Sequence, residues 1–165
     1  MFHIGDLVIY SGQGICRVDD ICDKTYKDMT KTYYVLHPIE NSQGLTISIP
    51  IDNHKIFIDK LMNKAEAEKI IQSFASKGID WIEKPQTRNQ VFHEIVNSGN
   101  RMEIAKVANT LLRRKSKMEA KGKKFHESDA KLLTNIQDIL FKELAIVLNC
   151  SYEEIYDKVD KMIHA

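Results

Sequence analysis

Hydrophobic and polar positions alternate with a period of two through the first 58 residues. The apolar segments are short and rich in β-branched and aromatic residues, and Gly, Asp, Asn and Ser separate them: LVIY, GICRV, TYYVLHP and LTISIPI. Pro50 has no backbone donor, so it should end a strand or lie on a sheet edge. The pattern predicts four or five short antiparallel strands in a small Tudor- or SH3-like β-barrel.

The opening stretch GDLVIYSGQGICRV, residues 5–18, places two apolar runs around a break that contains Gly12 and Gly14. A phosphate loop of the Walker type would need a Lys-[Ser/Thr] pair after the glycines, and none follows. The stretch therefore predicts a β-hairpin and not a nucleotide site.

From residue 63 onward the apolar positions repeat with a period of 3.6. This spacing predicts helices over residues 63–77, 87–98, 101–119, 127–149 and 151–163. Two of them begin with the spacing of a capping box, Asn100 with Glu103 and Ser151 with Glu154. Gly78 and Gly99 stand where left-handed C-terminal caps are expected. The predicted fold class is α+β, with a β-barrel over residues 1–58 and a bundle of about five helices over residues 63–165.

Composition narrows the class of protein. The 165 residues include 43% hydrophobic and 28% charged residues, with a net charge of +1, and no apolar run reaches the ~18 residues of a membrane span. Cys16, Cys22 and Cys150 are odd in number and lack CxxC spacing, as is typical of reduced cytosolic thiols. We therefore expect a soluble, cytoplasmic protein without a secretory leader.

The sequence offers no recognisable catalytic constellation. The six histidines form no HExxH motif and do not combine with cysteine at metal-ligand spacing, and no serine lies in a GxSxG motif. The pair Glu153–Glu154 lies in the first turn of a predicted helix, where it complements the helix dipole. We expect no enzyme activity, no cofactor and no metal site.

Charge is unevenly distributed along the chain. Residues 113–124, RRKSKMEAKGKK, carry seven cationic side chains and one acidic side chain. Such a run is either a solvated helix end or a surface that neutralises phosphates. The β half is mildly acidic, which suits a protein partner, so the two halves favour different partners.

Trp81 is the single tryptophan, and it lies in a predicted connector between helices, KGIDWIEKPQTRNQ. It could be a lid packed over the helical bundle. It could also be an exposed apolar wedge beside Lys84 and Arg88, of the kind that proteins insert into the minor groove. Both readings are open at this point.

Several motifs together resemble the CarD family of bacterial transcription regulators, whose N-terminal module also occurs in the transcription-repair coupling factor. They follow in order along nearly the whole chain: FHIGDLVIYSGQGICRV, YYVLHP, LTISIPIDN, IVNSGNRMEIAKVANTLLRRKSK and LTNIQDILFKELAIVLN. The resemblance implies a Tudor-like module that binds the β subunit of RNA polymerase by its strand edge. It also implies a helical module that contacts promoter DNA at the upstream edge of the bubble, with a tryptophan in the minor groove, and thereby stabilises the open complex.

Carried onto this sequence, the resemblance assigns two sets of residues. Those expected to face polymerase are Lys24, Tyr34, Ser48, Ile49 and Pro50. Those expected to face DNA are Trp81, Lys84, Arg88, Arg113, Arg114, Lys123, Lys124 and Lys131. The expected location is the bacterial nucleoid, and the expected state is a monomer, with a domain-swapped dimer as the alternative.

The sequence departs from the family pattern at both surfaces. Two polymerase-facing arginines of well-known members are replaced by Lys24 and Ser48, and the family's wedge position falls on Pro85, one helical turn after Trp81. A protein–protein adaptor that binds no DNA is therefore kept as an alternative function. An RNA-binding module is a weaker one, because Tyr33 and Tyr34 alternate faces and provide no stacking platform.

Overall fold

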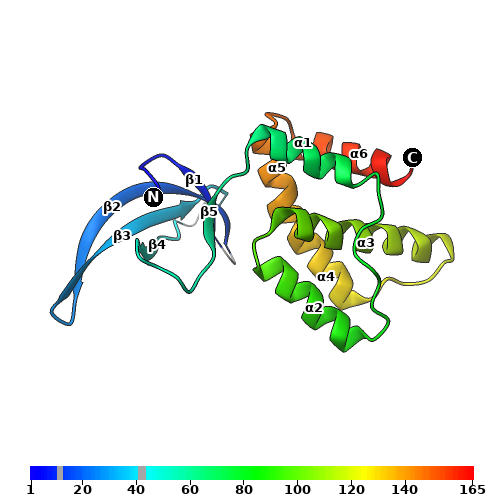
Figure 1. The fold of residues 1–165 in the computed structure, drawn as a ribbon, viewed down its shortest axis with the longest axis horizontal. Coiled ribbons are helices and arrows are strands. Elements are labelled where there is room, and N and C mark those ends of the chain that lie inside the picture. Colours follow the sequence, from blue (N-terminus) through cyan, green and yellow to red (C-terminus); the bar gives the residue numbers. More distant parts are fainter. Residues whose placement is uncertain (11–12, 41–43) are drawn as a thin grey trace. The chain divides into compact units, whose positions relative to one another are not determined.

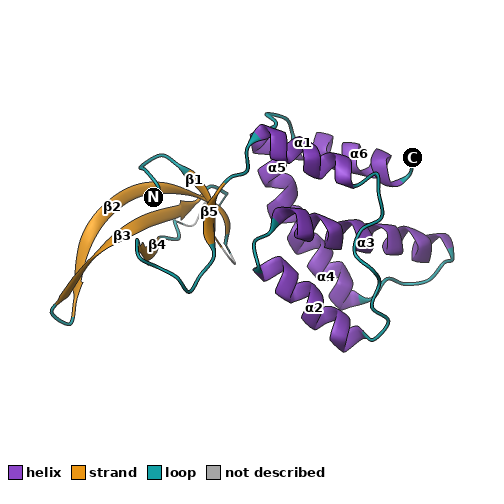
Figure 2. Cartoon of the chain, viewed as in Figure 1, coloured by secondary structure: helices purple, strands orange, loops and turns teal. Residues whose placement is uncertain are grey.

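A computed structural model describes residues 1–10, 13–40 and 44–165, and the chain divides into two units, Met1–Leu61 and Met62–Ala165 (Figure 1). The first unit consists of strands and the second of helices (Figure 2), which confirms the predicted α+β class. Within the described ranges, no helix is both long and apolar enough to cross a membrane.

Five antiparallel strands form one sheet in the first unit, in the order β4-β3-β2-β1-β5. Their bounds are β1 Leu7–Tyr10, β2 Gly14–Tyr26, β3 Met29–Pro38, β4 Ile47–Pro50 and β5 Ile58–Lys60. A small core is buried against the sheet: Val8, Cys16, Val18, Tyr34, Leu36 and Ile49. Pro50 ends β4, and β4 is an edge strand, so both expectations for this proline are confirmed.

The opening stretch forms the predicted hairpin, with Val8 opposite Cys16 and Tyr10 opposite Gly14. Gly14 has a φ of 78°, a conformation that glycine adopts without steric cost. Gly12, the other glycine of the predicted break, lies outside the described residues.

The prediction of uniformly short strands is wrong for β2 and β3, which have 13 and 10 residues. Strand β2 continues through the polar segment DDICDKTY and returns as β3 through a two-residue loop of Lys27 and Asp28. These residues have φ angles of 49° and 63°, as a type I′ turn requires at both central positions. Because the twist of this turn matches the twist of the strands, it allows a long hairpin.

The helical unit is built around α3. Its elements are α1 Lys64–Ser73, α2 Pro85–Asn97, α3 Arg101–Ala120, α4 Glu127–Ile136, a π-helical turn Gln137–Phe141, α5 Lys142–Val147 and α6 Tyr152–Ile163. Helices α1 and α6 lie along one side of α3, and α2 and α4 lie along the other (Figure 1). The core between them is apolar and includes Phe74, Phe92, Leu111 and Phe141, all fully buried.

Helix starts follow the predicted caps. The side chain of Asn100 accepts a hydrogen bond from the backbone of Glu103, and that of Ser151 accepts one from Glu154. The predicted helix over residues 127–149 forms, with the π-helical turn Gln137–Phe141 inside it.

The two predicted glycine caps have different outcomes. Gly99 has a φ of 74° after α2, so its left-handed cap is confirmed. Gly78 has no positive φ, and α1 already ends at Ser73, so the predicted cap there is wrong. A Cβ at Gly78 would collide with the Lys106 carbonyl and would lie 2.9 Å from the Thr110 nitrogen. Glycine is required at position 78 because the connector passes directly against α3.

Candidate functional sites

Within the part of the chain that the structure describes, strand β4 presents an open edge of the sheet. The sheet ends at β4 on one side, and β4 pairs with β3 by placing Ser48 opposite Val35 and Ile49 opposite Tyr34. The amide of Ile51 donates to the carbonyl of Thr32 at 3.1 Å. Because backbone groups alternate in direction along a strand, those of Ser48 and Pro50 point away from β3. Ser48 therefore offers an N–H and a C=O to an added strand, whereas Pro50 offers a C=O alone.

The predicted polymerase-facing side chains divide into exposed and buried ones. The ammonium of half-buried Lys24 donates to the hydroxyl of exposed Ser48 at 2.6 Å, so these residues of β2 and β4 meet at one place. Tyr34 is 5% exposed and accepts a hydrogen bond from the Phe2 amide, and Ile49 is 3% exposed. Tyr34 and Ile49 therefore belong to the core of the sheet, and the side chains left for a partner are Lys24, Ser48 and half-buried Pro50.

The connector between α1 and α2, residues 74–84, runs along α3, and we call it the strap. A polar stripe on α3, which includes Asn109, Thr110 and Arg113, fixes the strap to that helix. Asn109 is 1% exposed and donates to the carbonyls of Ser73 and Ser76, at 3.3 and 2.7 Å. The hydroxyl of Thr110 donates to the carbonyl of Ile79. Arg113 reaches the carbonyls at the end of α1, and its Nη2 donates to the carbonyl oxygen of Phe74 at 2.8 Å. These bonds satisfy backbone carbonyls of the strap and hold the strap against α3.

Trp81 sits on this strap with its ring against two guanidinium groups. The Cζ atom of Arg88 lies 4.3 Å from the ring centroid, and that of Arg114 lies 4.7 Å from it. Both distances are within the range of cation–π attraction. Trp81 is half-buried and packs against the core of the helical unit, so its surroundings combine features of the lid and of the wedge.

A cationic hollow of about 140 Å³ lies beside Trp81. Its lining comes from the strap and from α3: Lys77, Gly78, Ile79, Trp81, Thr110, Arg113, Arg114 and Lys117. The Nε–H of Arg114 is buried and has no hydrogen-bond partner among the described residues. The hollow therefore brings an aromatic ring and four cationic side chains to one place.

The remaining predicted DNA-facing residues are not all at the surface. Arg88 is 3% exposed and forms an ion pair with Asp129, so it is not available to a phosphate in this structure. Lys84, Lys123 and Lys124 are exposed. Lys131 is also exposed, with its ammonium 3.4 Å from the carboxylate of Glu127, which offsets part of its charge.

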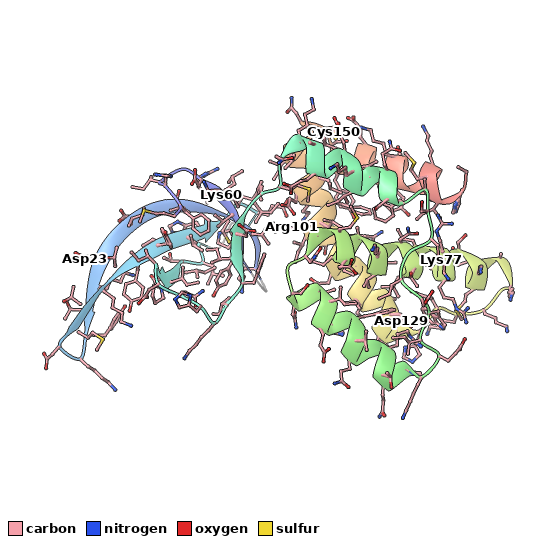
Figure 3. All side chains as sticks on the ribbon, in the orientation of Figure 1. Asp23, Lys60, Lys77, Arg101, Asp129 and Cys150 are labelled. Carbon is pink, nitrogen blue, oxygen red and sulfur yellow. The ribbon has the colours of Figure 1, made fainter. Side chains whose placement is uncertain are left out.

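Lys77 carries an ion pair at the rim of the hollow. Its ammonium lies 2.8 Å from the carboxylate of Asp80, and both side chains are largely exposed. The hydrogen bond and the charge of Lys77 lower the pKa of Asp80, and those of Asp80 raise the pKa of Lys77. Both groups stay charged at neutral pH. Figure 3 labels Lys77 on the strap where it runs beside α3.

Sequence reasoning missed several residues at or near this site, namely Lys77, Asn109, Thr110 and Asp129, whereas Lys117 belongs to the basic run 113–124 that the sequence singles out. A signal for the stripe exists, because Lys106, Asn109, Thr110 and Arg113 follow the same i, i+3, i+4, i+7 spacing as an apolar face. No comparable signal identifies Asp129, which meets Arg88 from a separate helix. In the described part of the chain, no group of three or more His, Cys, Asp or Glu residues is arranged to hold a metal ion.

Comparison with known proteins matches both units to one family. Residues 2–62 match the family described as CarD-like/TRCF RID domain, and residues 69–160 match the CarD C-terminal domain. Together the two matches cover most of the chain, which therefore belongs to the CarD family, a family of transcription regulators. A similar protein is "Putative transcription factor YdeB" of Bacillus subtilis (strain 168), 24% identical over 158 residues, which cover 94% of this chain and 97% of that protein.

Proposed function

We propose that this protein binds the β subunit of RNA polymerase through unit Met1–Leu61 and upstream promoter DNA through unit Met62–Ala165, and thereby stabilises the open initiation complex. Membership of the CarD family supports a role in transcription. The surfaces of the two units support separate partners, since one has an open strand edge and the other has a cationic hollow.

The position of Trp81 is the main observation that supports the proposed DNA binding of the helical unit. Its ring is half-buried between the core and two guanidinium groups, at the rim of a hollow that Lys77, Arg113, Arg114 and Lys117 make cationic. An apolar ring beside cationic anchors is the combination that minor-groove proteins use to open a base step. The exposed Lys84, Lys123 and Lys124 then add contacts to neighbouring phosphates.

The polymerase part rests on the open edge of β4. An added strand would donate to the carbonyls of Ser48 and Pro50 and accept from the amide of Ser48, and such backbone bonds give affinity in strand addition. The ammonium of Lys24 beside Ser48 favours an acidic side chain on the partner. The interior positions of Tyr34 and Ile49 keep the edge in register without touching the partner.

A second function is favoured by the buried arginine. With Arg88 paired to Asp129 and Arg113 bound to carbonyls of the strap, fewer cations reach the surface than the sequence predicts. A polymerase adaptor without DNA contact would have the same fold.

The salt dependence of duplex binding by the full chain distinguishes the two functions. For B-DNA, the slope of log K against log salt falls by ~0.9 for each phosphate contact removed. We expect the triple change of Lys123, Lys124 and Lys131 to Ala to weaken binding to all duplexes and to reduce this slope. A matched change of Lys158 and Lys161, exposed on α6, should leave the slope unchanged. An unchanged slope in the triple variant, or no binding by the parent, favours the adaptor.

A further inference from the structure

Arg88 is a charged side chain in the interior of the helical unit, 3% exposed, and the proposed DNA contact leaves it without a role. Burying a charge is costly unless it is paired and fully hydrogen-bonded. An apolar side chain of similar volume would often serve stability as well as a buried ion pair does. Stability alone therefore does not account for a buried arginine at this position.

The guanidinium of Arg88 is held on all sides. Its Nε and Nη2 donate to the two carboxylate oxygens of Asp129, at 3.0 and 2.7 Å, in a bidentate arrangement. Its Nη1 donates to the carbonyls of Ile82 and Glu83, at 2.9 and 3.2 Å. Asp129 is itself 4% exposed, near the start of α4 (Figure 3). Arg88 thus joins three segments: α2, α4 and the strap just after Trp81.

The same guanidinium lies under the ring of Trp81, 4.3 Å from its centroid. Arg88 also fixes the two residues that follow Trp81, because the carbonyls of Ile82 and Glu83 accept hydrogen bonds from its Nη1. Arg114 also contacts the ring, but its Nε–H has no partner in the described part of the chain. Every nitrogen of the Arg88 guanidinium therefore donates at least one hydrogen bond, whereas the Nε of Arg114 donates none to the described residues.

We propose that Arg88, held by Asp129, is the positioning residue for Trp81: it sets the orientation in which the ring meets duplex DNA. This inference rests on the proposed function of Trp81. Lysine cannot replace arginine here, because an ammonium has no planar fork to bind a carboxylate and two carbonyls while it faces a ring. Asp129 acts one step further back, by fixing the plane of the guanidinium.

Trp81 is the single tryptophan, so its fluorescence reports its own position. In the full chain, we expect Arg88→Lys to shift the emission of Trp81 to longer wavelength and to increase its quenching by acrylamide. The lifetime of open promoter complexes should shorten roughly fivefold, as the loss of one cation–π contact to a half-buried ring would give. Asp129→Asn, which keeps the shape of the side chain, should change both quantities in the same direction and to a smaller extent.

A second buried ion pair provides the matched control. Arg101 pairs with Glu143 at 3.2 Å, with side-chain exposures of 15% and 1%, whereas the two cation–π contacts described for the Trp81 ring come from Arg88 and Arg114. Arg101→Lys should lower the melting temperature and leave the fluorescence of Trp81 and the open-complex lifetime unchanged. Adding Arg88→Lys to Trp81→Ala should not shorten the lifetime further, because coupled residues have non-additive effects.

The proposal is overturned if Arg88→Lys and Asp129→Asn lower the melting temperature without changing the quenching of Trp81. It is also overturned if Arg101→Lys changes that quenching as much as Arg88→Lys does, because the effect is then one of general stability. If Trp81→Ala leaves the open-complex lifetime unchanged, the proposed function fails. The quenching measurements still decide whether Arg88 positions the ring.

Discussion

Trp81 belongs partly to the core and partly to the surface, and this decides what its removal should do. A fully exposed wedge would contribute little to stability, whereas truncation of a fully buried tryptophan costs ~3–5 kcal/mol. The ring is half-buried, packs against the core and faces two guanidinium groups. Part of the ring surface is therefore buried against the core, and the rest is accessible to a partner.

We expect Trp81→Ala to destabilise the helical unit by about 2 kcal/mol, roughly half the cost for a buried ring, and to lower its melting temperature by about 10 °C. Trp81→Phe keeps an aromatic face for both arginines and should lose less than half as much. Thermal unfolding followed by circular dichroism measures both. An unchanged melting temperature for Trp81→Ala would mean that the ring contributes nothing to packing in solution.

The three cysteines should differ in reactivity for a reason that is visible at each residue. Burial raises the pKa of the Cys16 thiol to about 11, so at pH 8 this group stays protonated. The thiolate is the nucleophile, and Cys16 is also inaccessible in the core of the sheet. Cys22 and Cys150 are half-buried. We expect iodoacetamide at pH 8 to modify Cys22 and Cys150 first, as peptide mass spectrometry would detect. Equal labelling of all three would mean that the sheet opens readily.

At the scale of elements, the sequence predicts what repeats and misses what depends on a single turn. The apolar period of α3 and the caps at Asn100 and Ser151 lie within a few neighbouring residues, so pattern alone locates these helices. The long hairpin of β2 and β3 was missed because Lys27 and Asp28 are not the Asn-Gly pair that usually marks a type I′ turn. The parts of β2 and β3 next to this turn are also largely polar, and burial is the signal on which strand prediction depends.

The candidate site shows the same division. Clustered cations and a single tryptophan are visible in sequence, so Trp81 and the basic run could be singled out. That Arg88 points inward could not be, because its partner Asp129 lies 41 residues away in another helix. In the same way, Gly78 has the sequence context of a helix cap, and its contact with α3 exists only in the tertiary structure.

The open edge of β4 yields a prediction that belongs to the strand. Ser48→Pro removes the one outward-facing amide that we infer for Ser48, without removing a bond to β3. Proline is tolerated on edge strands for this reason. We expect Ser48→Pro and Lys24→Glu each to weaken binding to the polymerase β subunit with little loss of stability, and Lys161→Glu on α6 to have no effect. Titration of the full chain against polymerase measures this. Parental affinity in both β-unit variants would remove β4 from the interface.

At the scale of the whole molecule, two units with separate cores are joined by residues 61–63, between β5 and α1. A tether of this kind makes the second binding event intramolecular, with an effective concentration of the order of millimolar when the geometry allows both contacts. Under the proposed function, a weak contact of the helical unit with DNA would then suffice once the first unit is bound to polymerase. The modest net charge of +1 is consistent with recruitment through the first unit, because long-range attraction to DNA is then not required.

The two surfaces should therefore affect open complexes in different ways when the protein is titrated. Lys24→Glu should raise the concentration for half-maximal stabilisation about fivefold, since one exposed charge contact is worth on the order of 1 kcal/mol. The lifetime at saturation should stay at the parental value, because the DNA surface is intact. Trp81→Ala should leave the half-maximal concentration nearly unchanged and shorten the saturated lifetime about tenfold, from the loss of an aromatic–base contact. The measurement is the decay of competitor-resistant promoter complexes over a range of protein concentrations. If both variants shift the same parameter, the units do not divide recruitment and bubble stabilisation between them, and the adaptor function becomes the better account.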